Sequence, residues 1–284
     1  MMKTFKVLGV LIVSFLLSCS DKEHSDERNE LKVKFTQYSG FVKDTFHIQL
    51  QVPKEYYSNP DKKYPVVILL DGNFYFPIMS SIVQQYEIAG LLPPIILVGV
   101  GYKSFKTMDS LRVRDYLFPK ALPSDELESD GGGLNFYNYL TRELIPKVDG
   151  DYRTESANRT LLGHSFAGYF ALYSLFHQTV SDTNEFRNFI SASPSLWYNN
   201  FYLKPLPEQL AKSERKVGLY ISVGEMEDST WSVKPLMDIT KEIGERKIKG
   251  LEFNSRIYNH LEHMDVAILT FTKGLQDMFK IKEQ

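Results

Sequence analysis

The chain has 284 residues, of which 43% are hydrophobic and 24% are charged. This composition is expected of an ordinary globular enzyme, and the length suits one large α/β domain or two small ones. The formal net charge is −2 at pH 7, and lysines and arginines are scattered instead of forming basic runs. We therefore expect no nucleic-acid partner, because such binding needs a concentrated positive surface.

The N-terminal segment predicts export. Lys3 and Lys6 precede an apolar stretch at residues 7–17, which is shorter than the roughly 20 apolar residues needed to span a membrane. The stretch ends in Leu16-Leu17-Ser18-Cys19, which resembles a bacterial lipobox, in which the cysteine is lipidated. The alternative is a simple secretory signal with a cysteine at its cleavage site by chance.

We expect residues 1–18 to be a lipoprotein signal peptide and Cys19 to be the lipidation site. Residues 19–30 are nearly all polar or charged and are typical of a solvated tether. Cys19 is the only cysteine, so we expect no disulfide. The sequence thus predicts an exported protein of the bacterial cell envelope, anchored to a membrane by lipid, with residues 31–284 as one domain.

The first half of this domain opens with strand-like segments at 31–39 and 45–52. Near-continuous apolar runs at 64–70 and 95–100 are typical of strands that are covered on both faces. A predicted helix at 76–90 lies between these two runs, which gives a βαβ unit.

The second half continues the alternation of strands and helices. Further strands are predicted at 159–162, 189–192, 217–223 and 251–257, and further helices at 134–148, 169–177, 233–244 and 264–279. The alternation predicts a doubly wound α/β fold with a mostly parallel sheet. The stretch at 102–133 is expected to be mostly irregular, either as a lid or pocket wall hinged at its terminal glycines or as a surface insertion without a role.

A candidate nucleophile lies where a predicted strand meets a predicted helix, in Gly163-His164-Ser165-Phe166-Ala167. A serine in such a tight turn points its hydroxyl away from the sheet, and the N–H of the next residue, Phe166, faces an oxyanion from the helix N-terminus. The usual pattern is Gly-x-Ser-x-Gly, and Ala167 stands at its last position. A plain strand–turn–helix is the alternative, and the order of the residues that follow favours the catalytic interpretation.

Candidate acids and bases follow two later strands. The strand at 217–223 runs into Glu225, Glu227 and Asp228, and the strand at 251–257 runs into His260 and His263. α/β-Hydrolases supply their triad in the order Ser, acid, His, each from the carboxyl end of a strand. We therefore expect a Ser-acid-His triad.

Within these two groups we prefer Glu227 and His263. Asp228 stays open as the second choice of acid, whereas Glu225 lies close to the strand. His263 abuts the last helix, as a base descending toward the nucleophile should. The spacing of His260 and His263 could instead suggest a metal pair, but no third ligand follows nearby, so we expect no metal.

Two further site residues come from other loops. The strand at 64–70 is followed by Asp71-Gly72-Asn73-Phe74, where the N–H of Asn73 or Phe74 could be a second oxyanion donor; an ordinary turn is the alternative. His164, beside the elbow, is expected to pack or hydrogen-bond there and to lie at the substrate pocket.

These residues resemble the putative esterases of the α/β-hydrolase superfamily, which include enterochelin-type siderophore esterases, esterase D, feruloyl and acetyl-xylan esterases and mycolyltransferases. The resemblance extends over about residues 40–275, and the segments that carry it are 64–72, 92–99, 114–119, 143–146, 163–168, 191–197 and 223–227.

The resemblance implies Ser165 as nucleophile, Glu227 as acid and His263 as base, with Asn73 near the oxyanion hole. It also implies that Trp197 lies beside the pocket, although a buried core tryptophan is the alternative. Two departures are Ala167 in place of glycine and Met264-Asp265 in place of the small Gly-Ser that often follows the histidine.

The leading hypothesis is a serine carboxylic-ester hydrolase that works through an acyl-enzyme and needs no cofactor. Its substrate would be a small-molecule or glycan ester, such as a siderophore or an acylated polysaccharide. An acyltransferase of the same fold is one alternative. A non-catalytic lipoprotein that kept the scaffold as a binding module is another, because fold does not guarantee function.

Overall fold

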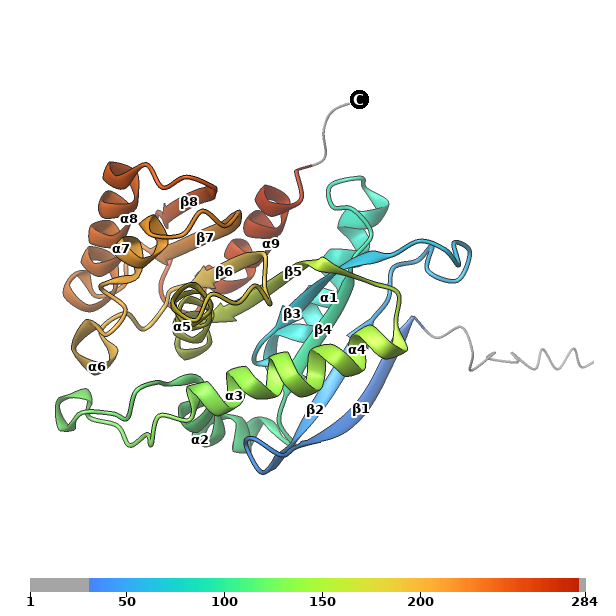
Figure 1. The fold of residues 1–284 in the computed structure, drawn as a ribbon, viewed down its shortest axis with the longest axis horizontal. Coiled ribbons are helices and arrows are strands. Elements are labelled where there is room, and N and C mark those ends of the chain that lie inside the picture. The colour runs from blue at the N-terminus through green and yellow to red at the C-terminus, as the bar shows by residue number, and fades with distance from the viewer. Residues whose placement is uncertain (1–30, 281–284) are drawn as a thin grey trace, which may run out of the picture. The chain divides into compact units, whose positions relative to one another are not determined.

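The computed structural model of the protein describes residues 31–280; the predicted signal peptide, Cys19 and the tether lie outside them. These residues share one eight-stranded sheet, in the order β1-β2-β4-β3-β5-β6-β7-β8 (Figure 1). The strands are β1 (Lys32–Ser39), β2 (Asp44–Gln51), β3 (Tyr64–Leu69), β4 (Ile96–Gly101), β5 (Thr154–His164), β6 (Asn188–Ala192), β7 (Val217–Gly224) and β8 (Leu251–Tyr258).

The sheet is antiparallel only at its first edge. β1 pairs with β2 and β2 with β4 in antiparallel register, whereas β4, β3, β5, β6, β7 and β8 all run parallel to their neighbours. A parallel sheet brings the carboxyl ends of its strands to one edge, where ligands bind in open α/β folds. The predicted α/β-hydrolase fold class is confirmed.

Helices cover both faces of the sheet. The principal helices are α1 (Gly72–Ile88), α2 (Phe105–Tyr116), α3 (Gly133–Tyr139), α4 (Ile145–Asp151), α5 (Phe166–Val180), α6 (Tyr198–Phe201), α7 (Leu206–Ala211), α8 (Lys234–Arg246) and α9 (Val266–Met278). In β3, Val67 and Leu69 belong to the core cluster that contains residues of α1 and α9, and Val66 and Ile68 belong to the cluster on the other face, which contains residues of α3 and α5. This alternation explains the unbroken apolar runs, because every side chain of a central strand is buried.

The segment at 102–133, expected to be mostly irregular, contains the helix α2, which was not predicted, and is irregular over most of its second half. Ser104 and Thr107 form a capping box at the start of α2, and a short 3₁₀ turn follows at Pro123–Asp125. The helix has almost no apolar periodicity, because only Met108, Asp115 and Tyr116 of its residues are buried. Polar contacts such as Arg112 with Asp71 and Arg114 with Asp44 therefore add to the apolar contacts that hold it on the domain.

Two other differences concern helix boundaries. The predicted helix at 134–148 is α3, a π-helical turn at Leu140–Leu144 and α4 in succession. The short helices α6 and α7 had no counterpart among the predicted elements.

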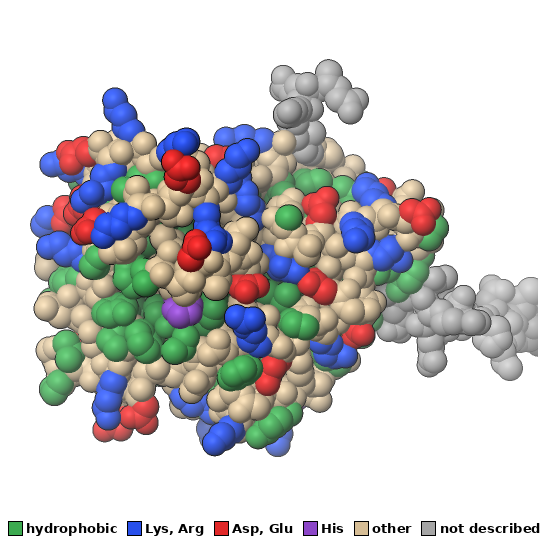
Figure 2. Space-filling model, viewed as in Figure 1, with side chains coloured by type: hydrophobic (Ala, Val, Ile, Leu, Met, Phe, Trp, Pro, Cys, Tyr) green, Lys and Arg blue, Asp and Glu red, His purple; other side chains and the backbone are tan. Residues whose placement is uncertain are grey.

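The surface of the described domain carries no single dominant charge on the face seen in Figure 2. Acidic and basic side chains are interspersed there, which agrees with the small net charge. Within residues 31–280, no helix combines the length and the apolar character that a membrane crossing requires.

Candidate active site

Ser165 occupies a strained turn between β5, which ends at His164, and α5, which begins at Phe166. Its backbone dihedrals are φ 61° and ψ −119°, a region that residues other than glycine rarely adopt. The Ser165 N–H donates to the Ala192 carbonyl at 3.0 Å, which helps to hold the turn. Such strain is typical of functional sites.

The small residues around Ser165 are required by close backbone approach. A Cβ on Gly163 would lie 2.0 Å from the Ala167 carbonyl oxygen, and one on Gly168 would lie 2.8 Å from the Ala192 carbonyl oxygen. Ala167 itself is fully buried. The turn therefore accommodates the methyl group of Ala167 but leaves no room for a side chain at residue 163.

Two backbone N–H groups were predicted to bind an oxyanion. Phe166 is the first residue of α5, and N–H groups in the first turn of a helix have no carbonyl partner within it. The side chain of Asn73 is bound to the loop after β4: its Oδ1 accepts from the Tyr102 N–H at 2.5 Å and its Nδ2 donates to the Tyr102 carbonyl at 2.7 Å. The Phe74 N–H donates to the Asp71 carbonyl, so the backbone N–H of Asn73 is the better candidate of the two.

Glu227 and His263 form a hydrogen-bonded pair at the same edge of the sheet. Glu227 follows β7, His263 follows β8, and His263 Nδ1 lies 2.8 Å from Glu227 Oε2. The other carboxylate oxygen accepts from the Ser193 hydroxyl at 2.5 Å and from the Gly224 N–H at 2.8 Å. A carboxylate only accepts hydrogen bonds, so the proton is on Nδ1, and Nε2 of the neutral ring is free to accept one.

The surroundings of Glu227 favour its ionised form. Its side chain is 2% exposed, whereas that of His263 is 42% exposed. Burial opposes ionisation, but the hydrogen bonds from His263, Ser193 and Gly224 outweigh it and lower the pKa of the Glu227 carboxyl. The pair thus has a buried anion that orients a partly exposed imidazole.

The alternative acids and base have other partners. Asp228 caps the following helical turn, because its Oδ1 accepts from the N–H groups of Thr230 and Trp231, each at 2.8 Å. Glu225 accepts from the backbone N–H of His260 at 3.1 Å. Within residues 31–280, no group of three or more His, Cys, Asp or Glu side chains is placed to hold a metal ion.

His164 lies beneath His263 and is 3% exposed. Its Nε2 donates to the His263 carbonyl at 2.8 Å, and its Nδ1 accepts from the Tyr75 hydroxyl at 2.9 Å. Burial and the neighbouring His263 lower the pKa of His164 to about 3. It is therefore a neutral hydrogen-bonding residue under the histidine loop.

A buried ion pair between Arg112 and Asp71 lies under the elbow, and no sequence pattern predicts it. Arg112 Nη2 is 2.8 Å from Asp71 Oδ2 and Nε is 3.2 Å from Oδ1. The same Nη2 donates to the His164 carbonyl at 3.1 Å, and the guanidinium lies 5.5 Å from the centre of the Phe166 ring. The pair connects the end of β3 with the turn that holds Ser165.

Trp197 lines a hollow of about 660 Å³ next to the elbow, together with Phe201 and Trp231. Its ring packs edge-to-face on Phe166, with the centroids 6.2 Å apart. Trp197 therefore contacts the residue directly after Ser165.

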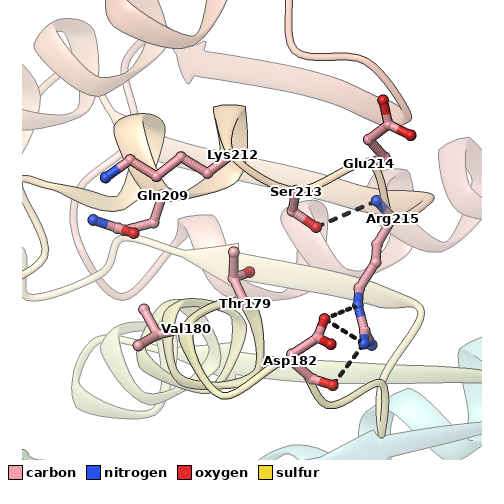
Figure 3. Close-up of a pocket in the computed structure, with 8 residues that line it drawn as sticks. All are labelled: Thr179, Val180, Asp182, Gln209, Lys212, Ser213, Glu214 and Arg215. Atoms are coloured by element: carbon pink, nitrogen blue, oxygen red, sulfur yellow. Dashed lines mark hydrogen bonds and ion pairs between the residues drawn. The ribbon is translucent and has the colours of Figure 1, made fainter.

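A second hollow, of about 600 Å³, lies at the opposite edge of the sheet (Figure 3). Its lining comes from the end of α5 and from the segment before β7. Arg215 there donates to the Asp182 carboxylate at 2.7 Å and to the Asp182 carbonyl at 2.6 Å. The other charged side chains of this hollow also have partners, Lys212 with Glu208 and Glu214 with Lys249, and none of the predicted site residues lines it.

Comparisons with known proteins find similarity to esterases. The model of a family described as Putative esterase matches residues 39–260. The ferri-bacillibactin esterase BesA of Bacillus subtilis is 30% identical over 198 residues, which are 64% of this chain and 66% of the relative. The apo-salmochelin esterase of Escherichia coli O6:H1 is 31% identical over 145 residues, 48% of this chain and 43% of the relative. The chain thus matches less than two thirds of the length of each.

The fold has close counterparts among solved structures. The crystal structure of the BES protein from Bacillus cereus superposes with a TM-score of 0.77 at 25% sequence identity, covering 89% of this chain and 97% of that one. The family match spans most of the described domain and includes Ser165 and Glu227. The protein belongs to the putative esterase family of α/β hydrolases.

Proposed function

We propose that the protein is a serine carboxylic-ester hydrolase that works through an acyl-enzyme. The observation that carries the proposal is the Glu227–His263 pair, at the edge of the sheet where Ser165 occupies its strained turn. A serine hydroxyl is a weak nucleophile until an adjacent base removes its proton. A histidine oriented by a buried carboxylate is the usual base.

In the first step, His263 Nε2 takes the proton of the Ser165 hydroxyl as Oγ attacks the ester carbonyl. The N–H groups of Phe166 and Asn73 stabilise the oxyanion that forms on the carbonyl oxygen. The tetrahedral intermediate collapses, the ester C–O bond breaks, and the imidazolium returns its proton to the departing alcohol. Glu227 stays ionised and stabilises the positive imidazolium.

In the second step, water replaces the alcohol. His263 takes a proton from water, the hydroxide adds to the acyl carbonyl, and Ser165 Oγ leaves with the returned proton. The products are a carboxylic acid and the free enzyme, so the cycle balances without a cofactor.

The names of the relatives favour siderophore esters as the first substrate class to test, with acylated polysaccharides as the second. BesA is described as acting on ferri-bacillibactin and the Escherichia coli relative on apo-salmochelin. The identities near 30% support the type of reaction more strongly than the particular substrate.

The test is hydrolysis of p-nitrophenyl acetate by a fragment that begins after Cys19, compared with its Ser165→Ala variant. Loss of the nucleophile is expected to reduce kcat by several orders of magnitude. Equal, near-background rates in two well-folded proteins would contradict the proposal and favour a binding module.

We also propose that the protein is anchored to a membrane through a lipid on Cys19. The support is the sequence Leu16-Leu17-Ser18-Cys19 after a short apolar stretch. Labelled palmitate is expected in the full chain and not in its Cys19→Ala variant, and equal labelling of both would contradict the proposal.

A further inference from the structure

The hollow beside Trp197 has an unusual combination of side chains. Three aromatic residues, Trp197, Phe201 and Trp231, line it together with two acidic residues, Asp125 and Glu126. Its volume of about 660 Å³ is within the range of pockets that bind small molecules. The mechanism described above uses none of these five side chains.

One loop connects this hollow to the candidate catalytic residues. The Ser193 hydroxyl donates to Glu227, the Ser195 N–H donates to the Ser165 carbonyl at 3.3 Å, and the Trp197 ring packs on Phe166. Trp197, which lines the hollow, therefore contacts the residue directly after the nucleophile. The hollow is thus placed to receive a substituent of an ester held at Ser165.

The aromatic residues offer flat surfaces to a ligand. The rings of Phe201 and Trp231 are nearly parallel, at 11°, with their centroids 6.0 Å apart, and Trp231 is 52% exposed. The backbone of Trp231 is fixed, because its N–H donates to Asp228. Aromatic faces of this kind bind another flat ring by stacking or edge contact.

The charges around the hollow are negative. The Asp125 carboxylate is held by the N–H groups of Leu122 at 2.8 Å and Asn199 at 3.1 Å. Glu126 is exposed, and no ion pair involves it within residues 31–280. No lysine or arginine is among the residues that line the hollow. An anion placed there would be repelled.

The neighbouring cations do not change this balance. Arg112 is paired with the buried Asp71 carboxylate, Lys120 with Asp130 and Lys234 with Asp238. Lys204 lines the adjoining hollow of about 300 Å³, across Phe201. A ligand ring packed on the exposed aromatic surface would therefore meet the two carboxylates without a compensating positive charge in the lining.

We propose that this hollow is the ring-binding subsite for the ester substrate and that it selects uncharged aromatic rings over anionic ones. This inference rests on the proposed esterase function. For a catechol ester, the uncharged form is the iron-free one, because Fe³⁺ displaces the phenol protons and leaves a complex with net negative charge. The iron-loaded ester is the poorer substrate of the two.

The test compares esters that differ only in the ring and its charge. Phenyl acetate and 4-carboxyphenyl acetate place a neutral or anionic ring on the alcohol side, ethyl phenylacetate and its 4-carboxylate place it on the acyl side, and ethyl acetate has no ring. Two variants probe the subsite, Trp231→Ala and Glu126→Lys. Their matched controls are Tyr38→Ala, an exposed aromatic residue of β1, and Glu128→Lys, an exposed acid that is not part of this lining.

Trp231→Ala is expected to lower kcat/KM for the neutral aryl ester about five- to tenfold and to leave ethyl acetate within about twofold, since one aromatic contact is lost. Glu126→Lys is expected to raise kcat/KM for the anionic ester by roughly three- to tenfold, because one like charge is replaced by an opposite one. Neither control variant should change these ratios. Bacillibactin without iron is expected to be hydrolysed at least about tenfold faster than its Fe³⁺ complex.

Two failures are distinguishable. Ser165-dependent hydrolysis of all the esters without any effect of ring charge, Trp231→Ala or Glu126→Lys would overturn the subsite alone. The absence of Ser165-dependent hydrolysis from every ester would overturn the esterase function, and the subsite with it.

Discussion

Two buried carboxylates lie at the same edge of the sheet, and their partners differ. Glu227 follows β7 and has a side chain that is 2% exposed, and Asp71 follows β3 and has one that is 3% exposed. Glu227 faces a histidine, whose charge can change, and two neutral donors. Asp71 faces a guanidinium, which stays positive at all ordinary pH values.

This difference indicates a role in the proposed chemistry for Glu227 and a role in stability for Asp71. The hydrogen bonds to Glu227 lower the pKa of its carboxyl, so it stays negative when His263 becomes positive. Burial raises the pKa of Asp71, and Arg112 offsets only part of that effect. Removing a partner should therefore reduce catalysis at Glu227 and stability at Asp71.

The two pairs meet at His164. Its carbonyl accepts from Arg112, and its ring donates to the His263 carbonyl. The strained turn at Ser165 directly follows. The Arg112–Asp71 pair thus supports the turn at Ser165 through the His164 carbonyl. The His164 ring supports the loop that contains His263.

The largest expected effect is that of Glu227→Gln. The amide keeps the shape but can neither fix the Nδ1 proton of His263 nor stabilise the imidazolium, so kcat should fall by about 10³- to 10⁴-fold. The measurement is kcat for p-nitrophenyl acetate, with urea unfolding to verify the fold. Asp228→Asn is the control and should stay within about threefold, because Asp228 only caps a turn. A loss of less than tenfold in kcat for Glu227→Gln, or equal losses in both variants, would contradict the proposed role of Glu227 as the acid that orients His263.

The next effect is on stability, in Arg112→Met. An unpaired buried carboxylate is expected to lower the free energy of unfolding by about 3–5 kcal/mol at pH 7. Loss of Arg112 raises the pKa of Asp71 further, so the deficit is full above that pKa and shrinks as the pH falls toward the ordinary value of 3.8. Urea unfolding at several pH values measures both.

The double variant Arg112→Met, Asp71→Asn is the control for this prediction. It removes both charges and should recover most of the stability lost in the single variant. A double variant as unstable as the single one would show that Arg112 acts through its other contacts, with the His164 carbonyl and the Phe166 ring.

The smallest effect is expected at His164. His164→Leu removes the hydrogen bond to the His263 carbonyl and should lower kcat about tenfold through misplacement of the histidine loop. His164→Gln can restore a donor near the Nε2 position and should retain most of the activity. Because the pKa of His164 is about 3, His164→Gln should leave the pH–rate profile between pH 5 and 9 unchanged. A lost acidic limb in that variant would identify His164 as a titrating group of the reaction.

The sequence predicts which turns share one edge of the sheet because its signals are local. Each signal lies within the segment whose structure it determines. The apolar runs form the buried strands β3, β5 and β7, and the small residues beside Ser165 form the tight turn itself. The chain order of the strands then places the turns after β5, β7 and β8 at one edge. That much follows without any knowledge of side-chain contacts.

The remaining parts of the site depend on contacts between distant residues. Arg112 meets Asp71 across 41 positions, from a helix whose polar sequence has no apolar stripe. The Ser193 hydroxyl meets Glu227 across 34 positions. No motif distinguishes Arg112 from an ordinary surface arginine. Ser193 lies in the segment 191–197 that carries the family resemblance, but nothing in that segment indicates a contact with Glu227.

The central claim is that Ser165 is the nucleophile of an acyl-enzyme, and the most direct measurement is covalent labelling. The fragment that begins after Cys19 would be treated with a fluorophosphonate and analysed by intact-mass and peptide mass spectrometry. We expect a single adduct, on Ser165. It should form much more slowly in Glu227→Gln and be absent from Ser165→Ala. A folded wild-type protein without an adduct, or with one on another residue, would contradict the central claim.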